Sequence, residues 1–180
     1  MSPPMSHMSL QDERISKLRV LVADPFAQLR EILRDILIRG VGVSEVLEAK
    51  NGEEAIALMR ELPCDVVIAD ARMEPLGGIE ITQMIRKGEE RIDPFIPVII
   101  VSGHAEVTEI VAARDAGANE YLAKPLSAKI LDLRLNAVVH HPRPFIRSDD
   151  FFGPDRRRHE SDRYKGSERR TVEPDIVDHK

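Results

Sequence analysis

Four short apolar runs in this chain are each followed at once by a polar residue. The runs and the residues after them are Val20 to Ala23 with Asp24, Val66 to Ala69 with Asp70, Val98 to Val101 with Ser102, and Tyr121 to Ala123 with Lys124. Continuous apolar runs of this length are typical of strands buried on both faces of a parallel sheet. Ligands bind outside the carboxyl ends of such strands. The pattern therefore predicts a parallel sheet that presents two carboxylates, a hydroxyl and an ammonium at one edge.

Helical patterns separate the predicted strands. Apolar side chains follow helical spacing from Phe26 to Leu37, and we expect Gly40 to end that helix. Residues 44–49 form a further predicted strand, closed by the turn pair Asn51-Gly52. The remaining helices are predicted over residues 53–62, from about Gly77, over 105–116 up to Gly117, and over 127–139 with Ser127 as N-cap. Five strands alternating with five helices predict a doubly wound α/β fold.

The composition divides the chain into three parts. With 180 residues it is long enough for one domain and an extension. Apolar residues recur up to about Val139, whereas residues 141–180 consist mainly of Arg, Asp, Glu, Pro and Ser. We therefore expect a flexible segment over residues 1–16, a folded domain over 17–140, and an arginine-rich, extended or disordered tail over 141–180.

Charge and cysteine content limit the partners and the compartment. A formal net charge of -5 gives no general affinity for nucleic acid or anionic membranes. The single cysteine, Cys64, excludes an internal disulfide, suits a reducing compartment and is expected to be buried. The first eight residues lack the regions of a signal peptide, and no apolar run approaches the ~20 residues of a spanning helix. We expect a cytoplasmic protein that neither binds DNA nor inserts into membranes.

The residues after the four runs suit phosphoryl transfer to a carboxylate, which needs mainly positioning and charge neutralisation. Asp70 would be the nucleophile, and Asp24 would help it to hold Mg²⁺. Lys124 would neutralise phosphoryl oxygens, and Ser102 would donate a hydrogen bond to one of them. Taken singly, the aspartates and the serine are ordinary turn or cap residues. A lysine that ends a buried strand beside Pro125 needs an anionic partner, and the four together favour phosphoryl transfer.

With further motifs, these residues resemble the receiver domain of two-component response regulators of the chemotaxis-regulator type. The motifs are Val20-Leu21-Val22-Ala23-Asp24, Glu48 to Ala55, Asp65 to Asp70, Gly117-Ala118 and Lys124-Pro125. The resemblance implies a flavodoxin-like five-stranded sheet with strand order 2-1-3-4-5. It also implies a single-domain response regulator that acts by contact with other proteins.

The same resemblance implies a role for each site residue. These roles are phosphoacceptor for Asp70, catalysis for Ser102 and Lys124, switch residues for Ser102 and Tyr121, and Mg²⁺ ligands for Asp24, Asp70 and the backbone carbonyl of Arg72. It implies a sensor histidine kinase or phosphotransfer protein as phosphoryl donor and a downstream protein as target. It implies no enzyme activity beyond the domain's own phosphoryl transfer and dephosphorylation.

Two departures from the family pattern affect the expected metal site. The family carries two adjacent acids after the first strand, and here Pro25 takes the second position, so we expect weak Mg²⁺ binding. The guanidinium of Arg72 could pair with a phosphoryl group or compete with the metal. Tyr121 has a second interpretation as a core side chain. A pseudo-receiver scaffold that does not need phosphorylation remains an alternative function.

The tail alternates phenylalanines with arginines, which pair with phosphates and stack on purines. Acids nearly balance these charges, which argues against duplex DNA. The tail is similar to the arginine-rich extension of receiver-like effectors that bind cyclic di-GMP. That resemblance implies a nucleotide site with the candidates Arg147, Phe151, Arg156, Arg157 and Arg158. The alternatives are a solvated disordered tail, or one whose phenylalanines dock on the domain.

Overall fold

A parallel five-stranded sheet forms the centre of the computed structural model, which describes residues 10–156 and 175–177. The strands are β1 (Arg19–Ala23), β2 (Glu45–Ala49), β3 (Val66–Asp70), β4 (Val98–Ser102) and β5 (Glu120–Ala123). Their order in the sheet is β2-β1-β3-β4-β5, which confirms the predicted topology. Each of the four predicted apolar runs lies in one of β1, β3, β4 and β5.

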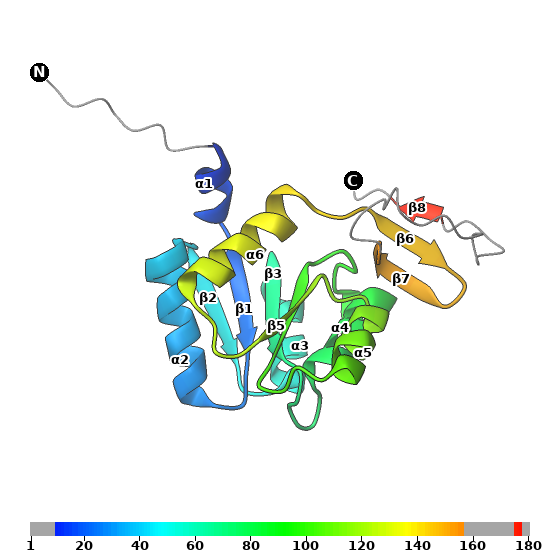
Figure 1. Ribbon diagram of the computed structural model, residues 1–180, viewed down its shortest axis with the longest axis horizontal. Coiled ribbons are helices and arrows are strands. Elements are labelled where there is room, and N and C mark those ends of the chain that lie inside the picture. The colour runs from blue at the N-terminus through cyan, green and yellow to red at the C-terminus, as the bar shows by residue number, and fades with distance from the viewer. Residues whose placement is uncertain (1–9, 157–174, 178–180) are drawn as a thin grey trace, which may run out of the picture.

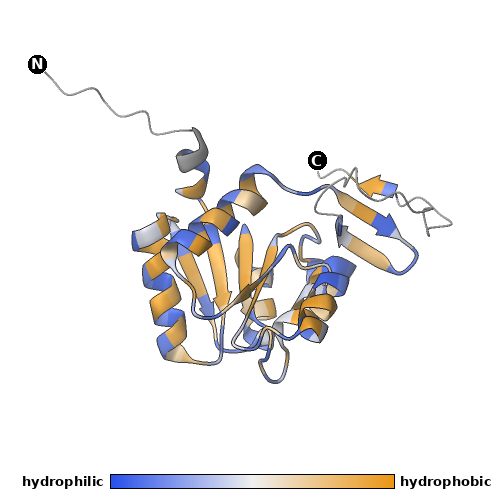
Figure 2. Ribbon diagram, viewed as in Figure 1, coloured by the Kyte–Doolittle hydropathy of each residue, from blue (hydrophilic) through white to orange (hydrophobic). Residues whose placement is uncertain are grey.

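Helices cover both faces of the sheet, so successive strand residues enter different cores. On one face, Leu21 packs with side chains of α3 (Gly52–Glu61), α4 (Gly78–Lys87) and α5 (Val107–Ala116). On the other, Val20 and Val22 pack with α2 (Ala27–Asp35) and α6 (Ala128–His140). Burying each such aliphatic side chain contributes roughly 1.5 to 3 kcal/mol. Figure 1 shows α6 in front of the sheet and α3 behind it, and Figure 2 shows the mainly hydrophobic strands between them.

Side-chain caps and glycines fix several helix ends as the sequence indicates. The Asn51 side chain accepts a hydrogen bond from the Glu54 backbone N–H at 2.9 Å, and so acts as an N-cap rather than only as part of a turn. Ser127 caps α6 in the same way. Gly117 adopts φ 97° after α5, a left-handed conformation that suits glycine and ends the helix.

The prediction that Gly40 ends the first long helix is wrong. The chain continues from α2 through a π-helical turn, η1 (Ile36–Val41), and the helix ends at Gly42 with φ 90°. A Cβ atom at Gly40 would lie 3.1 Å from the Cβ of Ala128. Gly40 therefore allows close approach of α6, while Gly42 supplies the left-handed residue that terminates the helix.

Two short elements were not indicated by the sequence pattern. Helix α1 (Leu10–Ile15) precedes the sheet, and Ile15 is buried in the core beneath α6. A single 3-10 turn, η2 (Glu89–Arg91), follows α4. Both are too short to carry a helical hydrophobic period of their own.

A small antiparallel sheet follows α6. Strands β6 (Phe145–Ser148) and β7 (Phe151–Pro154) form a hairpin, and β8 (Asp175–Val177) pairs with the other side of β6. The hairpin lies beside α4 and α5 at the right of Figure 1. Over these residues, the alternative in which the tail docks on the domain is the one that the structure shows.

Candidate functional site

The carboxyl ends of β1, β3 and β5 bring two carboxylates to one ammonium. The Nζ atom of Lys124 donates hydrogen bonds to Asp24 Oδ2 at 2.6 Å and to Asp70 Oδ2 at 2.5 Å. Burial of Lys124 opposes its charge, but the hydrogen bonds to the two aspartates outweigh that effect and raise its pKa. The ammonium is therefore held in its charged form directly beside the expected phosphoacceptor.

Backbone groups hold the remaining carboxylate oxygens in place. Asp24 is only 1% exposed, and its Oδ1 atom accepts a hydrogen bond from the Phe26 N–H at 2.8 Å. Asp70 Oδ1 accepts from the Arg72 N–H, also at 2.8 Å. Each aspartate thus closes the turn after its strand and faces Lys124 at the same time. The turn-residue interpretation and the site interpretation are compatible.

Among the described residues at this edge of the sheet, the oxygen atoms that could bind a cation belong to Asp24, Asp70 and nearby backbone carbonyls. Over the described residues, no group of three or more His, Cys, Asp or Glu side chains could hold a metal ion. Pro25, which directly follows Asp24, offers no carboxylate. Mg²⁺ is usually bound in proteins by one or two carboxylates together with waters, so these residues fit that cation.

Ser102 lies at the end of β4, but its hydroxyl is engaged with an acid on the next helix. Ser102 Oγ donates to Glu109 Oε2 at 2.7 Å and accepts from the His104 N–H at 3.1 Å. The Tyr121 hydroxyl lies within hydrogen-bond distance of two acceptors, the same Glu109 oxygen and the His104 carbonyl, the latter at 2.8 Å. The two expected switch residues are therefore joined through Glu109, a residue that the sequence interpretation missed.

The guanidinium of Arg72 completes this arrangement. Its Nε atom donates to Glu109 Oε1 at 2.8 Å, and this hydrogen bond raises the Arg72 pKa. We call Glu109, Ser102, Tyr121 and Arg72 the Glu109 cluster. Burial alone would raise the pKa of Glu109, but hydrogen bonds from Tyr121, Arg72 and Ser102 together lower it. The carboxylate is thus held as an anion by three donors.

Of the tail residues proposed for a nucleotide, the structure describes Arg147, Phe151 and Arg156, and the two arginines line different cavities. The guanidinium of Arg156 lies 3.9 Å from the centre of the Phe151 ring, and Arg147 lies 4.7 Å from the centre of the Phe152 ring. Arg147 lines a cavity of about 620 Å³ near the ends of α4 and α5, whereas Arg156 lines a different one of about 420 Å³. Arg157 and Arg158 lie outside the described residues.

The hairpin covers a buried cation. Arg86 is 6% exposed and donates to the backbone carbonyls of Gly117, Pro94 and Ile96 and to Asn119 Oδ1. Burial lowers its pKa to about 9, which leaves it protonated at neutral pH.

Aromatic rings lie over that cation. The Phe145 ring lies 5.0 Å from the Arg86 guanidinium, and 5.0 Å from Phe95 and 5.4 Å from Phe152 between ring centres. Such contacts stabilise the docked hairpin through both apolar burial and cation–π attraction.

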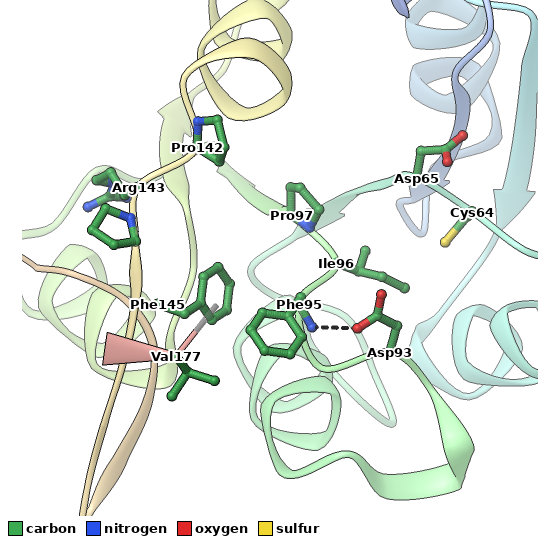
Figure 3. A pocket seen from close by; sticks show the side chains of 11 residues that line it. Cys64, Asp65, Asp93, Phe95, Ile96, Pro97, Pro142, Arg143, Phe145 and Val177 are labelled. Carbon is green, nitrogen blue, oxygen red and sulfur yellow. Dashed lines mark hydrogen bonds between the residues drawn. The ribbon is translucent and has the colours of Figure 1, made fainter. Parts of the chain in front are cut away.

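A cavity of about 450 Å³ opens beside these rings, at the sheet edge opposite Asp70. In Figure 3, Phe95 and Phe145 lie side by side among its lining residues, while Cys64 and Asp65 line it at a distance from these rings. Cys64 is buried, as expected, and burial raises its pKa to about 12. The thiol is therefore protonated and unreactive at neutral pH.

Comparisons with known proteins agree with this geometry. The family model for the response regulator receiver domain matches residues 20–136. The chain belongs to the response regulator receiver domain family. It is 30% identical over 121 residues to the chemotaxis protein CheY-3 of Vibrio cholerae, an alignment that covers 67% of this chain and 91% of CheY-3. Receiver domains act in two-component signalling and are not enzymes in the ordinary sense.

Solved structures show the same fold. The chemotaxis protein CheY4 of Vibrio cholerae superposes with a TM-score of 0.62 at 25% identity, over 68% of this chain and 99% of CheY4. The receiver domain of the sensor histidine kinase PA1611 from Pseudomonas aeruginosa, with a magnesium ion in its active-site cleft, superposes with a TM-score of 0.57 at 23% identity, over 67% and 95% of the two chains. No helix within the described residues is long and apolar enough to span a membrane.

Proposed function

We propose that this receiver is a response regulator that is phosphorylated on Asp70 by a histidine kinase or phosphotransfer protein in the cytoplasm. The observation that carries the proposal is the position of Lys124, whose ammonium contacts the carboxylates of both Asp70 and Asp24. A phosphoryl group added to Asp70 brings negative charge to a place where a fixed cation is already present. Because the Lys124 ammonium is already in place, solvent does not have to reorganise to offset the phosphoryl charge.

The proposed reaction transfers a phosphoryl group from the donor to the Asp70 carboxylate. One of its oxygens attacks the phosphorus atom of the donor and forms a new oxygen–phosphorus bond. The bond from phosphorus to the donor's imidazole nitrogen, or to the leaving oxygen of a small acyl phosphate, breaks, and the electron pair stays on the leaving atom. Asp70 enters as an anion paired with Lys124, so no base has to remove a proton.

Asp24, Asp70 and the backbone carbonyl of Arg72 are the residues that would hold Mg²⁺. When bound, the cation would offset the charge of the phosphoryl oxygens and of the two aspartates. The Phe26 N–H binds Oδ1 of Asp24, and this contact directs Oδ2 of the same carboxylate toward Lys124. The weak binding that Pro25 implies is part of this proposal.

The output surface that we propose is the face formed by α5, β5 and α6. Val107 is 76% exposed at the start of α5, and Ile110 and Val111 on the same helix are 39% and 38% exposed. Neighbouring apolar side chains of this kind suit contact with a protein target. Tyr121 on β5 connects this face to Ser102 through Glu109.

The test is phosphorylation by acetyl phosphate with Mg²⁺, followed by intact-mass measurement. We expect one added phosphoryl group on the wild type and none on Asp70→Asn. Asp65→Asn is the matched control, because Asp65 precedes the same strand at its opposite end. An unmodified wild type would instead support the pseudo-receiver alternative, and labelling of Asp70→Asn would place the modification elsewhere.

A second candidate function is recognition of an anionic nucleotide such as cyclic di-GMP by the tail. One observation favours it: the cavity of about 420 Å³ is lined by Arg114, Arg143 and Arg156 together with Tyr121. Guanidinium groups pair with phosphates and stack on purines. Titration of the full chain with cyclic di-GMP, with Arg156→Ala and Arg147→Ala compared, tests this proposal. Equal binding by both variants and the wild type, or no binding at all, would remove it.

A further inference from the structure

Glu109 belongs to no part of the phosphoryl site described so far, yet it binds three side chains beside that site. Its side chain is 11% exposed and contacts the hydroxyls of Ser102 and Tyr121 and the guanidinium of Arg72. These donors come from β4, β5 and the loop after β3. An acid that served only to keep the helix soluble would not accept hydrogen bonds from side chains of three separate segments.

The hydroxyl of Ser102 has one proton to donate. Its contact with Glu109 Oε2 at 2.7 Å is shorter than its contact with the His104 carbonyl at 3.0 Å. The bond to Glu109 is also charge-assisted, which makes it the stronger of the two. While the Ser102 hydroxyl donates this proton to Glu109, it cannot also donate to an oxygen of a phosphoryl group on Asp70.

The same competition applies to Arg72. The backbone of Arg72 donates to Asp70, so its side chain starts from the loop that borders the phosphoryl position. Its Nε atom is held at 2.8 Å from Glu109 Oε1, and its Nη2 atom lies 3.9 Å from Glu106 Oε1. While the guanidinium is paired with these two acids, its Nε proton is not available to phosphoryl oxygens.

We propose that Glu109 is a positioning residue for phosphorylation: its carboxylate holds Ser102 and Arg72 in the unphosphorylated protein and competes with the phosphoryl oxygens for the same donors. This inference rests on the proposed phosphorylation of Asp70. When phosphoryl oxygens draw Ser102 away, Glu109 loses a donor and its bond to Tyr121 changes with it. Glu109 thus opposes formation of the phosphorylated state, and it joins the site to the exposed face of α5.

The test measures the affinity of the full chain for beryllium fluoride with Mg²⁺, which mimics a phosphoryl group on an aspartate. Glu109→Gln keeps the shape of the side chain but removes its charge, and we expect binding at least about fivefold tighter, the lower end of ordinary coupling between two sites. Glu106→Gln is the matched control, because it removes an acid near Arg72 that touches neither Ser102 nor Tyr121. We expect a change of less than about twofold there, since an exposed ion pair contributes little.

A double substitution separates positioning from simple charge. In a Ser102→Ala background no hydroxyl remains for Glu109 to hold, so the gain from Glu109→Gln must shrink. A gain that persists unchanged would show that Glu109 does not act by holding the Ser102 hydroxyl and would overturn its positioning role toward that residue. Glu109→Ala serves as a second variant should Glu109→Gln unfold, because alanine is well tolerated in a helix.

The remaining outcomes distinguish the two proposals. If the wild type binds beryllium fluoride and Glu109→Gln binds equally or more weakly, the role of Glu109 is refuted and the proposed phosphorylation of Asp70 stands. If neither protein binds beryllium fluoride or takes phosphate from acetyl phosphate, the proposed function fails, and the role of Glu109 fails with it.

Discussion

Replacing Phe145 with alanine tests whether the C-terminal hairpin is an integral part of this receiver. Phe145 is 7% exposed and packs on Phe95, Phe152 and the Arg86 guanidinium. Truncating a buried phenylalanine costs about 3 to 5 kcal/mol. Because the hairpin lies at the periphery and can relax around the gap, we expect the lower end, about 3 kcal/mol of unfolding free energy.

Urea unfolding followed by circular dichroism measures this loss, and thermal unfolding should show a midpoint lowered by about 6 to 12 °C for a chain of this size. Phe26→Ala is the matched control, because Phe26 is 65% exposed and its loss should change stability by less than about 0.5 kcal/mol. Phe145→Leu keeps most of the apolar volume and should fall between the two. If Phe145→Ala and Phe26→Ala unfold at the same midpoint, the hairpin does not stabilise the domain and the reasoning is refuted.

Three further outcomes follow from the site and the core. Pro25→Asp restores a second acid and should tighten Mg²⁺ binding by about tenfold in calorimetry; an unchanged affinity would show that residue 25 does not face the cation. Cys64, with its pKa raised to about 12, should resist iodoacetamide at pH 8 until guanidinium unfolds the protein, and rapid alkylation of the native protein would contradict its burial. Burial and the hydrogen bond to Glu109 raise the pKa of Tyr121 to about 12. The unfolded chain loses this proton first, so stability should fall as pH rises from about 10 to 12, and less so in Tyr121→Phe.

The main sheet and its ligand edge could be predicted because their signals are local. Unbroken apolar runs indicate strands covered on both faces, and alternation with helices then restricts the topology. Parallel strands place their carboxyl ends together, so Asp24, Asp70 and Lys124 could be grouped without any knowledge of distance. Gly117 and Ser127 could be assigned as helix ends because capping depends on a few neighbouring residues.

Features that depend on contacts between distant segments could not be predicted. Gly40 looked like a helix stop, but its missing side chain makes room for α6, which begins almost ninety residues later. An acid in the first turn of a helix is ordinary, and nothing local indicates that Glu109 meets side chains from three segments. The docking of the tail could not be predicted, because Phe145 and Phe152 pack on Phe95, which lies in a loop far from them in sequence.

Both ends of helix α5 contact other segments of the protein. Near its start, Glu109 is bound to Ser102, and after its last turn the backbone of Gly117 packs directly against Gly153 of the hairpin. Sites that lie well apart in a protein usually contribute additively to a measured free energy. Here a stiff helix of ten residues connects them, so substitutions at Glu109 and Gly153 should show interaction energy in a double-mutant cycle. We therefore expect the two ends of α5 to be energetically coupled.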